Sequence, residues 1–176
     1  PSSHFCPPVA GYKPIEGLKH DIVTARKLLA AAGYGKDKRE FPKMEISYNT
    51  SEGHKMIAEA ISQQWKQNLG VDVGTRNMEW KVYLDNQNNL DYAISRSSWI
   101  GDYADPFTFF SIFRTDDGNN RTGWSCREYD ELLDTVSVTI DRKERNNLFK
   151  KLESLLVEQE CPVLPIYDYV NKGLIK

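Results

Sequence analysis

Two absences narrow the class of protein before any motif is considered. The chain has 176 residues, and no apolar run in it approaches the roughly 20 residues of a transmembrane helix. The chain also lacks an excess of charge of one sign. It contains 23 Lys and Arg and 25 Asp and Glu, which gives a formal net charge of -2. Nucleic acid and anionic lipid are therefore disfavoured as partners, since both are bound through a basic surface.

Cysteine is scarce, and the common catalytic motifs are missing. Cys6, Cys126 and Cys161 lie far apart without a C-x-x-C pair, which excludes a zinc ribbon or a thioredoxin-type motif. Their odd number leaves at least one thiol unpaired, and the spacing does not show whether the other two are bridged. H-E-x-x-H, G-x-S-x-G, the P-loop and G-x-G-x-x-G are absent. We therefore predict no catalytic residue, no metal site and no cofactor.

The composition that remains is typical of a globular domain. Hydrophobic residues make up 40% of the chain and charged residues 27%, which is enough of each for a core and a polar surface. Repeated prolines and glycines predict that residues 1–20 form an irregular N-terminal arm, because proline fixes φ and removes a backbone donor. We expect residues 21–176 to form a single α/β lobe. The chain begins Pro-Ser-Ser without an initiator methionine, and we expect it to be a fragment of a longer protein.

Hydrophobic periodicity predicts alternating strands and helices after the arm. A period near 3.6 predicts a helix over 22–32 that is capped by Asp21 and ended by Gly33. The same reasoning predicts strands at 44–48, 71–75, 90–99 and 163–175, helices at 51–69, near 80–84, at 129–138 and from 141 to 161, and turns over 101–124. Alternation of strand and helix favours an α/β fold with a mixed, largely parallel sheet flanked by helices.

The strand predicted at 90–99 carries an arginine where its pattern predicts a hydrophobe. Leu90, Tyr92 and Ile94 share one face of that strand, and Arg96 and Ser98 continue the same face. Ligands usually bind at the carboxyl ends of strands in an open α/β sheet, where a partly buried guanidinium favours a carboxylate or phosphate. The alternative is that the sheet has reached solvent and that the guanidinium points into water.

Two carboxylates follow directly, among aromatic residues. Asp102 and Asp105 lie within the segment WIGDYADP, residues 99–106. An aspartate that is desolvated by aromatic rings needs a cation or several donors to stay charged. That cation could be a metal ion, a lysine or the ammonium of a ligand. An acid–base or metal pair of a hydrolase is the least favoured interpretation, because no motif supports it.

Five segments of the chain carry a resemblance to a known family. They are ARKLLAAAGY (25–34), YNTSEGHK (48–55), EWKVYL (79–84), SRSSWIGDYADP (95–106) and PIYDYVN (165–171). In this order they resemble the C-terminal lobe of bacterial oligopeptide-binding proteins, the extracellular solute-binding proteins of family 5 that serve peptide ABC transporters. The resemblance implies a lobe of the periplasmic-binding-protein type II fold. It also implies that a short peptide lies between this lobe and a missing N-terminal lobe, which close by a hinge motion.

The resemblance implies a peptide-binding role for a set of residues: Asn49, His54, Trp80, Arg96, Ser98, Trp99, Ile100, Asp102, Tyr103 and Tyr169. Asp102 matches the aspartate that pairs with the peptide α-ammonium. The backbone from Ser98 to Ile100 would bond the peptide main chain, which is a form of strand addition that reads backbone and not sequence. The Asp-Tyr pair at 102 and 103 resembles binders of oligopeptides more than binders of dipeptides.

The other matching residues lie where the family meets the peptide C-terminus and side chains. Arg96 and His54 match positions that meet the terminal carboxylate, directly or through water. The walls of the side-chain pockets are matched by Trp80, Trp99, Asn49 and Tyr169. The family also implies a location in the periplasm or on the outer face of the cell membrane, and an ABC permease in the membrane as a partner. A solute-sensing module of a transcription regulator is the alternative from another class.

Overall fold

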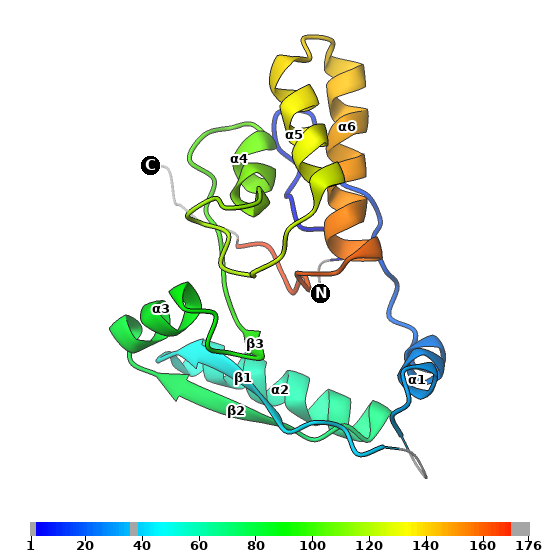
Figure 1. Ribbon diagram of the computed structural model, residues 1–176, viewed down its shortest axis with the longest axis vertical. Helices are drawn as coiled ribbons and strands as arrows, with labels where there is room; N and C mark the ends of the chain where they lie inside the picture. The colour runs from blue at the N-terminus through cyan, green and yellow to red at the C-terminus, as the bar shows by residue number, and fades with distance from the viewer. Residues whose placement is uncertain (1–2, 36–38, 170–176) are drawn as a thin grey trace, which may run out of the picture. The chain divides into compact units, whose positions relative to one another are not determined.

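The computed structural model describes residues 3–35 and 39–169, which fall into two compact units (Figure 1). The sheet unit is His20–Ser98. The helical unit combines Pro1–Lys19 with Trp99–Lys176. Each unit has its own hydrophobic core. That residues 21–176 act as a single ligand-binding lobe stays a prediction.

The sheet unit alternates helices and strands around a three-stranded parallel sheet. Its elements are α1 (Ile22–Ala31), β1 (Met44–Asn49), α2 (Glu52–Leu69), β2 (Val73–Met78), α3 (Trp80–Asn88) and β3 (Ile94–Ser95). The strand order is β2-β1-β3, and β1 pairs in parallel with both neighbours. The predicted α/β fold with a parallel sheet is confirmed, and α2 runs along this sheet in Figure 1.

The helix ends of the sheet unit follow from local chemistry. The Asp21 carboxylate accepts hydrogen bonds from the backbone N–H groups of Val23 and Thr24, and these bonds fix the start of α1. Gly70 ends α2 in the left-handed conformation, with φ of 70°, and Gly33 follows α1 with φ of 88°. Only glycine adopts such angles without strain, so both predicted helix ends are confirmed.

The core of the sheet unit is built on its central strand. Ile46, Ser47 and Tyr48 of β1 are all buried, as expected for a strand covered on two sides. The buried residues Ile46, Tyr48, Ala58, Val71 and Val73 form this core, and Trp65 of α2 packs against it.

The third strand is much shorter than predicted. The sequence pattern predicts a strand over 90–99, whereas β3 spans only Ile94–Ser95. Leu90 turns the chain with a positive φ of 54°, which no strand allows. After β3, one further bond, from the Arg96 N–H to the Ser47 carbonyl oxygen (2.8 Å), extends the pairing with β1. The prediction that Leu90 and Tyr92 share a strand face with Arg96 is therefore wrong.

The helical unit is built around a pair of long helices. Its elements are α4 (Phe107–Phe110), η1 (Ser111–Phe113), α5 (Arg127–Val138), α6 (Arg142–Ser154) and the π-helical turn η2 (Leu155–Gln159). Helices α5 and α6 lie side by side (Figure 1). The Asp141 carboxylate accepts a hydrogen bond of 2.7 Å from the Glu144 N–H, so the predicted cap of α6 is confirmed.

The predicted turn-rich stretch 101–124 also contains two short helices, α4 and η1, which bury Phe110, Ile112 and Phe113. The strand predicted at 163–175 is wrong for the residues that the structure describes. Residues 163–169 form no strand, and 170–175 lie outside the described residues. Strands depend on partners that are distant in sequence, and an aromatic segment alone does not supply one.

The N-terminal arm is irregular but belongs to the core of the helical unit. Residues 3–19 contain no helix or strand. Cys6 and Tyr12 are nevertheless fully buried. The Tyr12 ring meets Phe110 and Phe149 edge-on, with centroids 6.1 and 5.8 Å apart. The arm is thus a structural part of this unit, which the proline pattern did not reveal.

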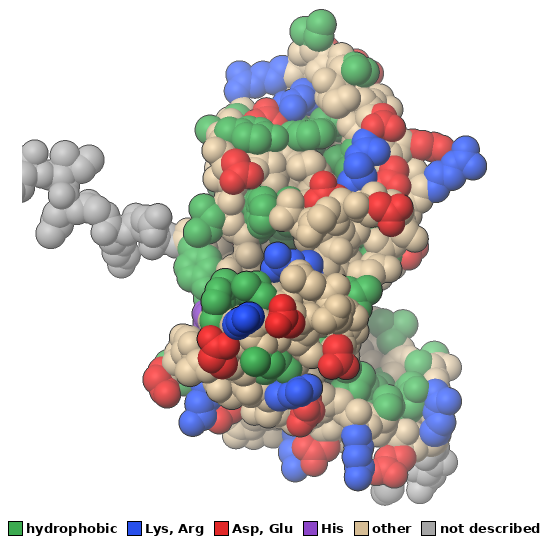
Figure 2. Space-filling view, turned by 60° about the vertical axis from the view of Figure 1, so that its left-hand side comes forward, with side chains coloured by type: hydrophobic (Ala, Val, Ile, Leu, Met, Phe, Trp, Pro, Cys, Tyr) green, Lys and Arg blue, Asp and Glu red, His purple; other side chains and the backbone are tan. Residues whose placement is uncertain are grey.

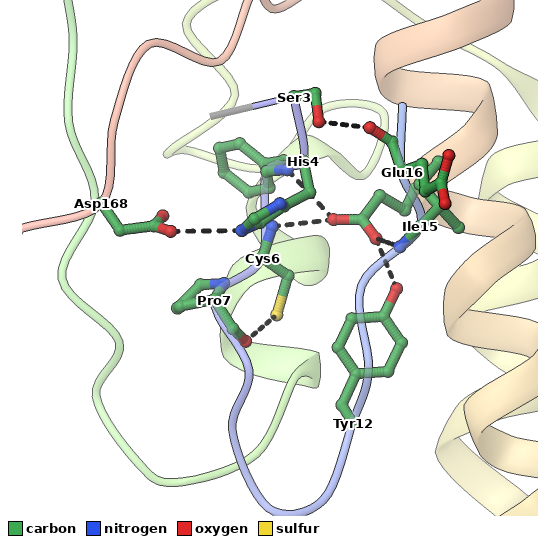
Figure 3. Close-up of polar contacts among 10 residues, drawn as sticks. Ser3, His4, Cys6, Pro7, Tyr12, Ile15, Glu16 and Asp168 are labelled. Atoms are coloured by element: carbon green, nitrogen blue, oxygen red, sulfur yellow. Dashed lines mark hydrogen bonds and ion pairs between the residues drawn. The ribbon is translucent and has the colours of Figure 1, made fainter. Parts of the chain in front are cut away.

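A buried carboxylate on α6 holds the arm in place (Figure 3). Glu153 is completely buried, and its Oε1 accepts bonds from the N–H groups of Phe5 (3.0 Å) and Cys6 (2.9 Å). Its Oε2 accepts from the Tyr12 hydroxyl (2.6 Å) and the Ile15 N–H (3.0 Å). We call this arrangement the Glu153 clasp. Burial, and then the nearby carboxylate, raise the pKa of Tyr12 far above its ordinary value, so the hydroxyl remains a donor.

The three cysteines are not bridged to one another. Cys6 is buried, whereas Cys126 and Cys161 are partly buried. Burial, and then the Glu153 charge, raise the pKa of the Cys6 thiol well above its ordinary value. A thiol that stays protonated is a poor nucleophile, so Cys6 acts as a packing residue.

The surface carries both charges in a mixed arrangement. Lys and Arg side chains are interspersed with Asp and Glu on the face seen in Figure 2. Among the helices that the structure describes, none is long and apolar enough to cross a membrane.

Candidate functional site

In the sheet unit, the predicted site residues gather at the carboxyl ends of the parallel strands. Asn49 is the last residue of β1, Trp80 comes two residues after β2, and Arg96 directly follows β3. His54 lies in the first turn of α2, with its Nδ1 3.3 Å from the Asn49 carbonyl oxygen. Ligands of open α/β sheets bind at this edge, because helix starts and loops leave it uncovered.

A tyrosine that the sequence analysis missed links two parts of this edge. Trp80 is 55% exposed and stacks on Tyr83, with ring centroids 5.7 Å apart. Tyr83 is buried and donates its hydroxyl to the Arg96 carbonyl oxygen. The spacing of three residues puts Trp80 and Tyr83 on one helix face, and this signal could have identified Tyr83 as a support for Trp80.

Asn49 carries a buried side-chain oxygen at the same edge that has no partner among the described residues. Its Oδ1 is buried and has no hydrogen-bond partner in the part of the chain that the structure describes. Buried polar atoms nearly always have a partner, so an unpaired Oδ1 is unusual. Arg96 is partly buried and Ser98 is exposed at the end of the sheet unit. The roles of these three residues stay predictions.

In the helical unit, one buried threonine holds the loop that carries Asp102. Thr108 of α4 is 2% exposed. Its carbonyl oxygen accepts the indole N–H of Trp99 (2.9 Å), and its hydroxyl oxygen accepts the Asp102 N–H (3.1 Å). The same hydroxyl lies 3.5 Å from Oδ2 of Asp102 and donates to it. Thr108 thus fixes both ends of the segment from Trp99 to Asp102, and the sequence analysis missed it.

A glycine allows this loop to approach α4. A Cβ at Gly101 would lie 2.8 Å from Phe109 Cζ and 2.9 Å from Thr108 Cγ2. Real Cβ atoms do not come so close, and a side chain here would force the loop away. Glycine is therefore required for the contact between the Asp102 N–H and the Thr108 hydroxyl.

Asp105, the second predicted carboxylate, is already paired. Arg145 of α6 binds it through two bonds, Nη1 to Oδ2 (2.6 Å) and Nη2 to Oδ1 (2.9 Å), and lies 4.7 Å over the Phe149 ring. Burial alone raises the pKa of Asp105, but bonds from Arg145 and the Phe107 N–H outweigh it, and the net pKa is lowered. Asp105 is therefore structural. No group of three metal-binding side chains occurs among the residues in 3–35 and 39–169.

Asp102 differs from the desolvated aspartate that the sequence predicted. It is exposed, as are its neighbours Ile100 (81%) and Tyr103 (53%). Aromatic neighbours in sequence do not enclose a carboxylate when the loop projects their side chains outward. No ion pair reaches Asp102 from any residue that the structure describes. Its carboxylate is therefore open to a ligand. The pKa of the neighbouring Tyr103 is raised by partial burial, and then by the charges of Asp105 and Asp102.

The remaining predicted residue lies near the end of the described chain. Tyr169 is 56% exposed, and its ring meets that of Tyr167 edge-on at 5.0 Å. Most of the predicted residues thus form two groups, one at the strand ends of the sheet unit and one on the Trp99–Tyr103 loop. The first contains Asn49, His54, Trp80 and Arg96, and the second Trp99, Ile100, Asp102 and Tyr103.

Comparison with known proteins connects both groups to one family. Residues 1–121 match the family model of bacterial extracellular solute-binding proteins, family 5. The chain is 40% identical over 183 aligned residues to the periplasmic murein peptide-binding protein MppA of Escherichia coli, covering all of this chain and 34% of the relative. It is 41% identical over 157 residues to the oligopeptide-binding protein OppA of Bacillus subtilis, covering 86% of this chain and 28% of the relative.

Solved structures agree with the sequence relatives. The murein tripeptide-binding protein MppA of Escherichia coli matches with a TM-score of 0.88 and 38% identity, over 96% of this chain and 34% of that one. OppA of Haemophilus influenzae, in complex with RPPGFSPFR, matches with a TM-score of 0.79 and 34% identity, over 85% and 29%. The predicted fold class, a lobe of the periplasmic-binding-protein type II kind, is confirmed. The chain spans about a third of the length of these relatives, and it belongs to the bacterial extracellular solute-binding proteins of family 5.

Proposed function

We propose that this chain is the C-terminal lobe of a peptide-binding protein that captures short peptides for an ABC importer. The observation that carries the proposal is the Asp102 carboxylate, which is exposed, held on a fixed loop and not paired with any cation that the structure describes. Such a carboxylate suits the α-ammonium of a peptide. The relatives support this class of ligand, since they are named as binding proteins for murein peptides and oligopeptides.

The other residues would bind the rest of an extended peptide. The backbone of Ser98, Trp99 and Ile100 would pair with the peptide main chain, so that affinity depends little on peptide sequence. Arg96 and His54 would meet the terminal carboxylate. Arg96 follows β3 and His54 comes after β1, so both lie at the edge where α/β sheets bind ligands. Pocket walls would come from Trp80, Trp99, Asn49, Tyr103 and Tyr169, leaving room for water to adapt to different side chains.

The remaining parts of the machinery lie outside this chain. A second, N-terminal lobe would supply the other wall of the site and close over the peptide. The closed protein would deliver its cargo from the periplasm, or from the outer face of the membrane, to an ABC permease. The function is binding and not catalysis, and it requires no cofactor, metal ion or nucleic acid.

The test compares free and N-acetylated peptides in the full-length protein. Asp102→Asn should weaken binding of a free tripeptide roughly 100-fold or more, because a buried ammonium would lose its charged partner. Acetylation removes the ammonium, so the same substitution should change the affinity for the N-acetylated tripeptide less than about threefold. Isothermal titration calorimetry measures both, with Asp116→Asn, an exposed loop aspartate, as the matched control. Equal losses for the two peptides would contradict the proposal.

A further inference from the structure

The contacts of Thr108 point to a role beyond packing. Its side chain is almost fully buried, at 2% exposure, and its hydroxyl makes two contacts, both with Asp102. The hydroxyl oxygen accepts the Asp102 N–H at 3.1 Å. Its proton is thereby left to point at Asp102 Oδ2, 3.5 Å away. A single hydroxyl therefore fixes the backbone of Asp102 and orients its carboxylate.

Thr108 is itself held in place from both sides of the loop. Its N–H donates to the Asp105 carbonyl oxygen at 3.3 Å, and its own carbonyl oxygen accepts the Trp99 indole at 2.9 Å. Asp105 is anchored in turn to α6 by its two bonds to Arg145. The hydroxyl therefore occupies a fixed point that does not depend on a ligand.

We propose that Thr108 is a positioning residue that sets the Asp102 carboxylate for the peptide ammonium and so creates the preference for peptides with a free N-terminus. This inference rests on the proposed function. The long contact of 3.5 Å orients Oδ2 without neutralising it, and Oδ1 stays free for the ammonium. A carboxylate that is already oriented loses less conformational entropy when the ligand binds, which increases affinity.

Thr108 in this role differs from a residue that merely stabilises the fold. Without the hydroxyl, the Asp102 N–H loses its acceptor and the carboxylate can rotate away from the ligand. Removing the hydroxyl should therefore weaken the binding of the peptide ammonium and leave the other contacts with the peptide unchanged. A packing residue would instead weaken every peptide to the same extent, because it would disturb the whole loop.

The experiment uses the full-length protein and the same pair of tripeptides, free and N-acetylated. Thr108→Val keeps the shape and removes the hydroxyl, and it should weaken the free peptide about tenfold and the acetylated peptide less than about twofold. Thr108→Ser retains the hydroxyl and should bind both as the natural protein does. Thr108→Ala is measured in parallel, since it removes the hydroxyl without placing a second methyl against the loop. Adding Thr108→Val to Asp102→Asn should cause no further loss.

The outcomes distinguish this inference from the proposed function. Asp102→Asn should weaken the free peptide more than the acetylated one. If it does so but both Thr108→Val and Thr108→Ala weaken the two peptides equally, Thr108 has no positioning role and the inference is overturned. A Thr108→Ser protein that binds the free tripeptide more weakly than the natural protein does, with the acetylated one unchanged, would overturn it too. If Asp102→Asn itself shows no discrimination, the proposed function fails first, and the inference fails with it.

Discussion

Two carboxylates of the helical unit illustrate two opposite uses of the same chemical group. Glu153 is completely buried and its two oxygens accept four hydrogen bonds from the N-terminal arm. Asp102 is exposed, and its carboxylate has a single long contact, with Thr108. A carboxylate that its own chain saturates holds the fold together, whereas one that is oriented but unsaturated can bind a ligand. The environment, and not the residue type, decides between these uses.

Removing the saturated carboxylate should produce the largest change in stability. Glu153→Gln replaces one acceptor oxygen with an NH₂ group that faces the same donors. Tyr12 can rotate its hydroxyl to accept, but a backbone N–H such as that of Ile15 cannot and would stay unpaired. We expect the free energy of unfolding to fall by roughly 3 kcal/mol, because a buried unsatisfied donor costs about 1–3 kcal/mol and a charged acceptor is lost as well.

Urea unfolding of the full-length protein, followed by tryptophan fluorescence, measures this change. Glu144→Gln is the matched control, because Glu144 lies on the same helix with its side chain exposed. That control should shift the free energy of unfolding by less than about 0.5 kcal/mol. A wild-type midpoint for Glu153→Gln would show that the clasp does not stabilise the arm.

An intermediate effect is expected at the Arg145–Asp105 pair, which lies between the two extremes. Both side chains are about a quarter exposed, at 27% and 28%, and they share two bonds. Arg145→Met keeps the stem of the side chain but removes both bonds and the contact with the Phe149 ring. The free energy of unfolding should fall by roughly 1–2 kcal/mol.

An exposed ion pair serves as the control for the Arg145–Asp105 pair. Arg127 and Glu131 form an ion pair on α5 with side chains 92% and 63% exposed. Arg127→Met should therefore cost less than about 0.5 kcal/mol in the same urea titration. If both arginine substitutions cost the same, burial does not strengthen the Arg145 pair.

The smallest effect is the pH dependence of that pair. The folded protein holds Asp105 with a pKa below its ordinary value of about 3.9, so the charged form is the one that stabilises the fold. The stabilisation is complete above the ordinary pKa and is lost as the pH falls through the lower pKa of the folded state. The difference in urea midpoint between wild type and Arg145→Met should therefore shrink from pH 6 to below pH 3. A constant difference over this range would contradict the assignment.

The sequence predicted what local chemistry controls. The helices capped by Asp21 and Asp141, the helix end at Gly70 and the α/β order were correct, because each depends on neighbouring residues. The short β3 and the burial of the arm were missed, because they depend on residues far away in the chain. Tyr12, for example, is buried against Phe149 and Glu153, more than 130 residues later.

The candidate site shows the same division. Residue chemistry alone identified Asp102 but left its cation open, and the resemblance to a family supplied the ammonium. Neither route could identify Arg145, which lies 40 residues from Asp105 in the sequence. Thr108 was also invisible, since nothing in the local pattern distinguishes it from a threonine that only packs.

The Glu153 clasp also constrains the order in which the chain can fold during synthesis. Phe5 emerges from the ribosome 148 residues before the glutamate that binds its N–H. The strands and helices of the sheet unit, by contrast, meet partners that are close in sequence, and short loops close fastest. Within this chain, the arm is thus made before the sheet unit but finds its place after it, and until then its apolar side chains are exposed to chaperones and proteases.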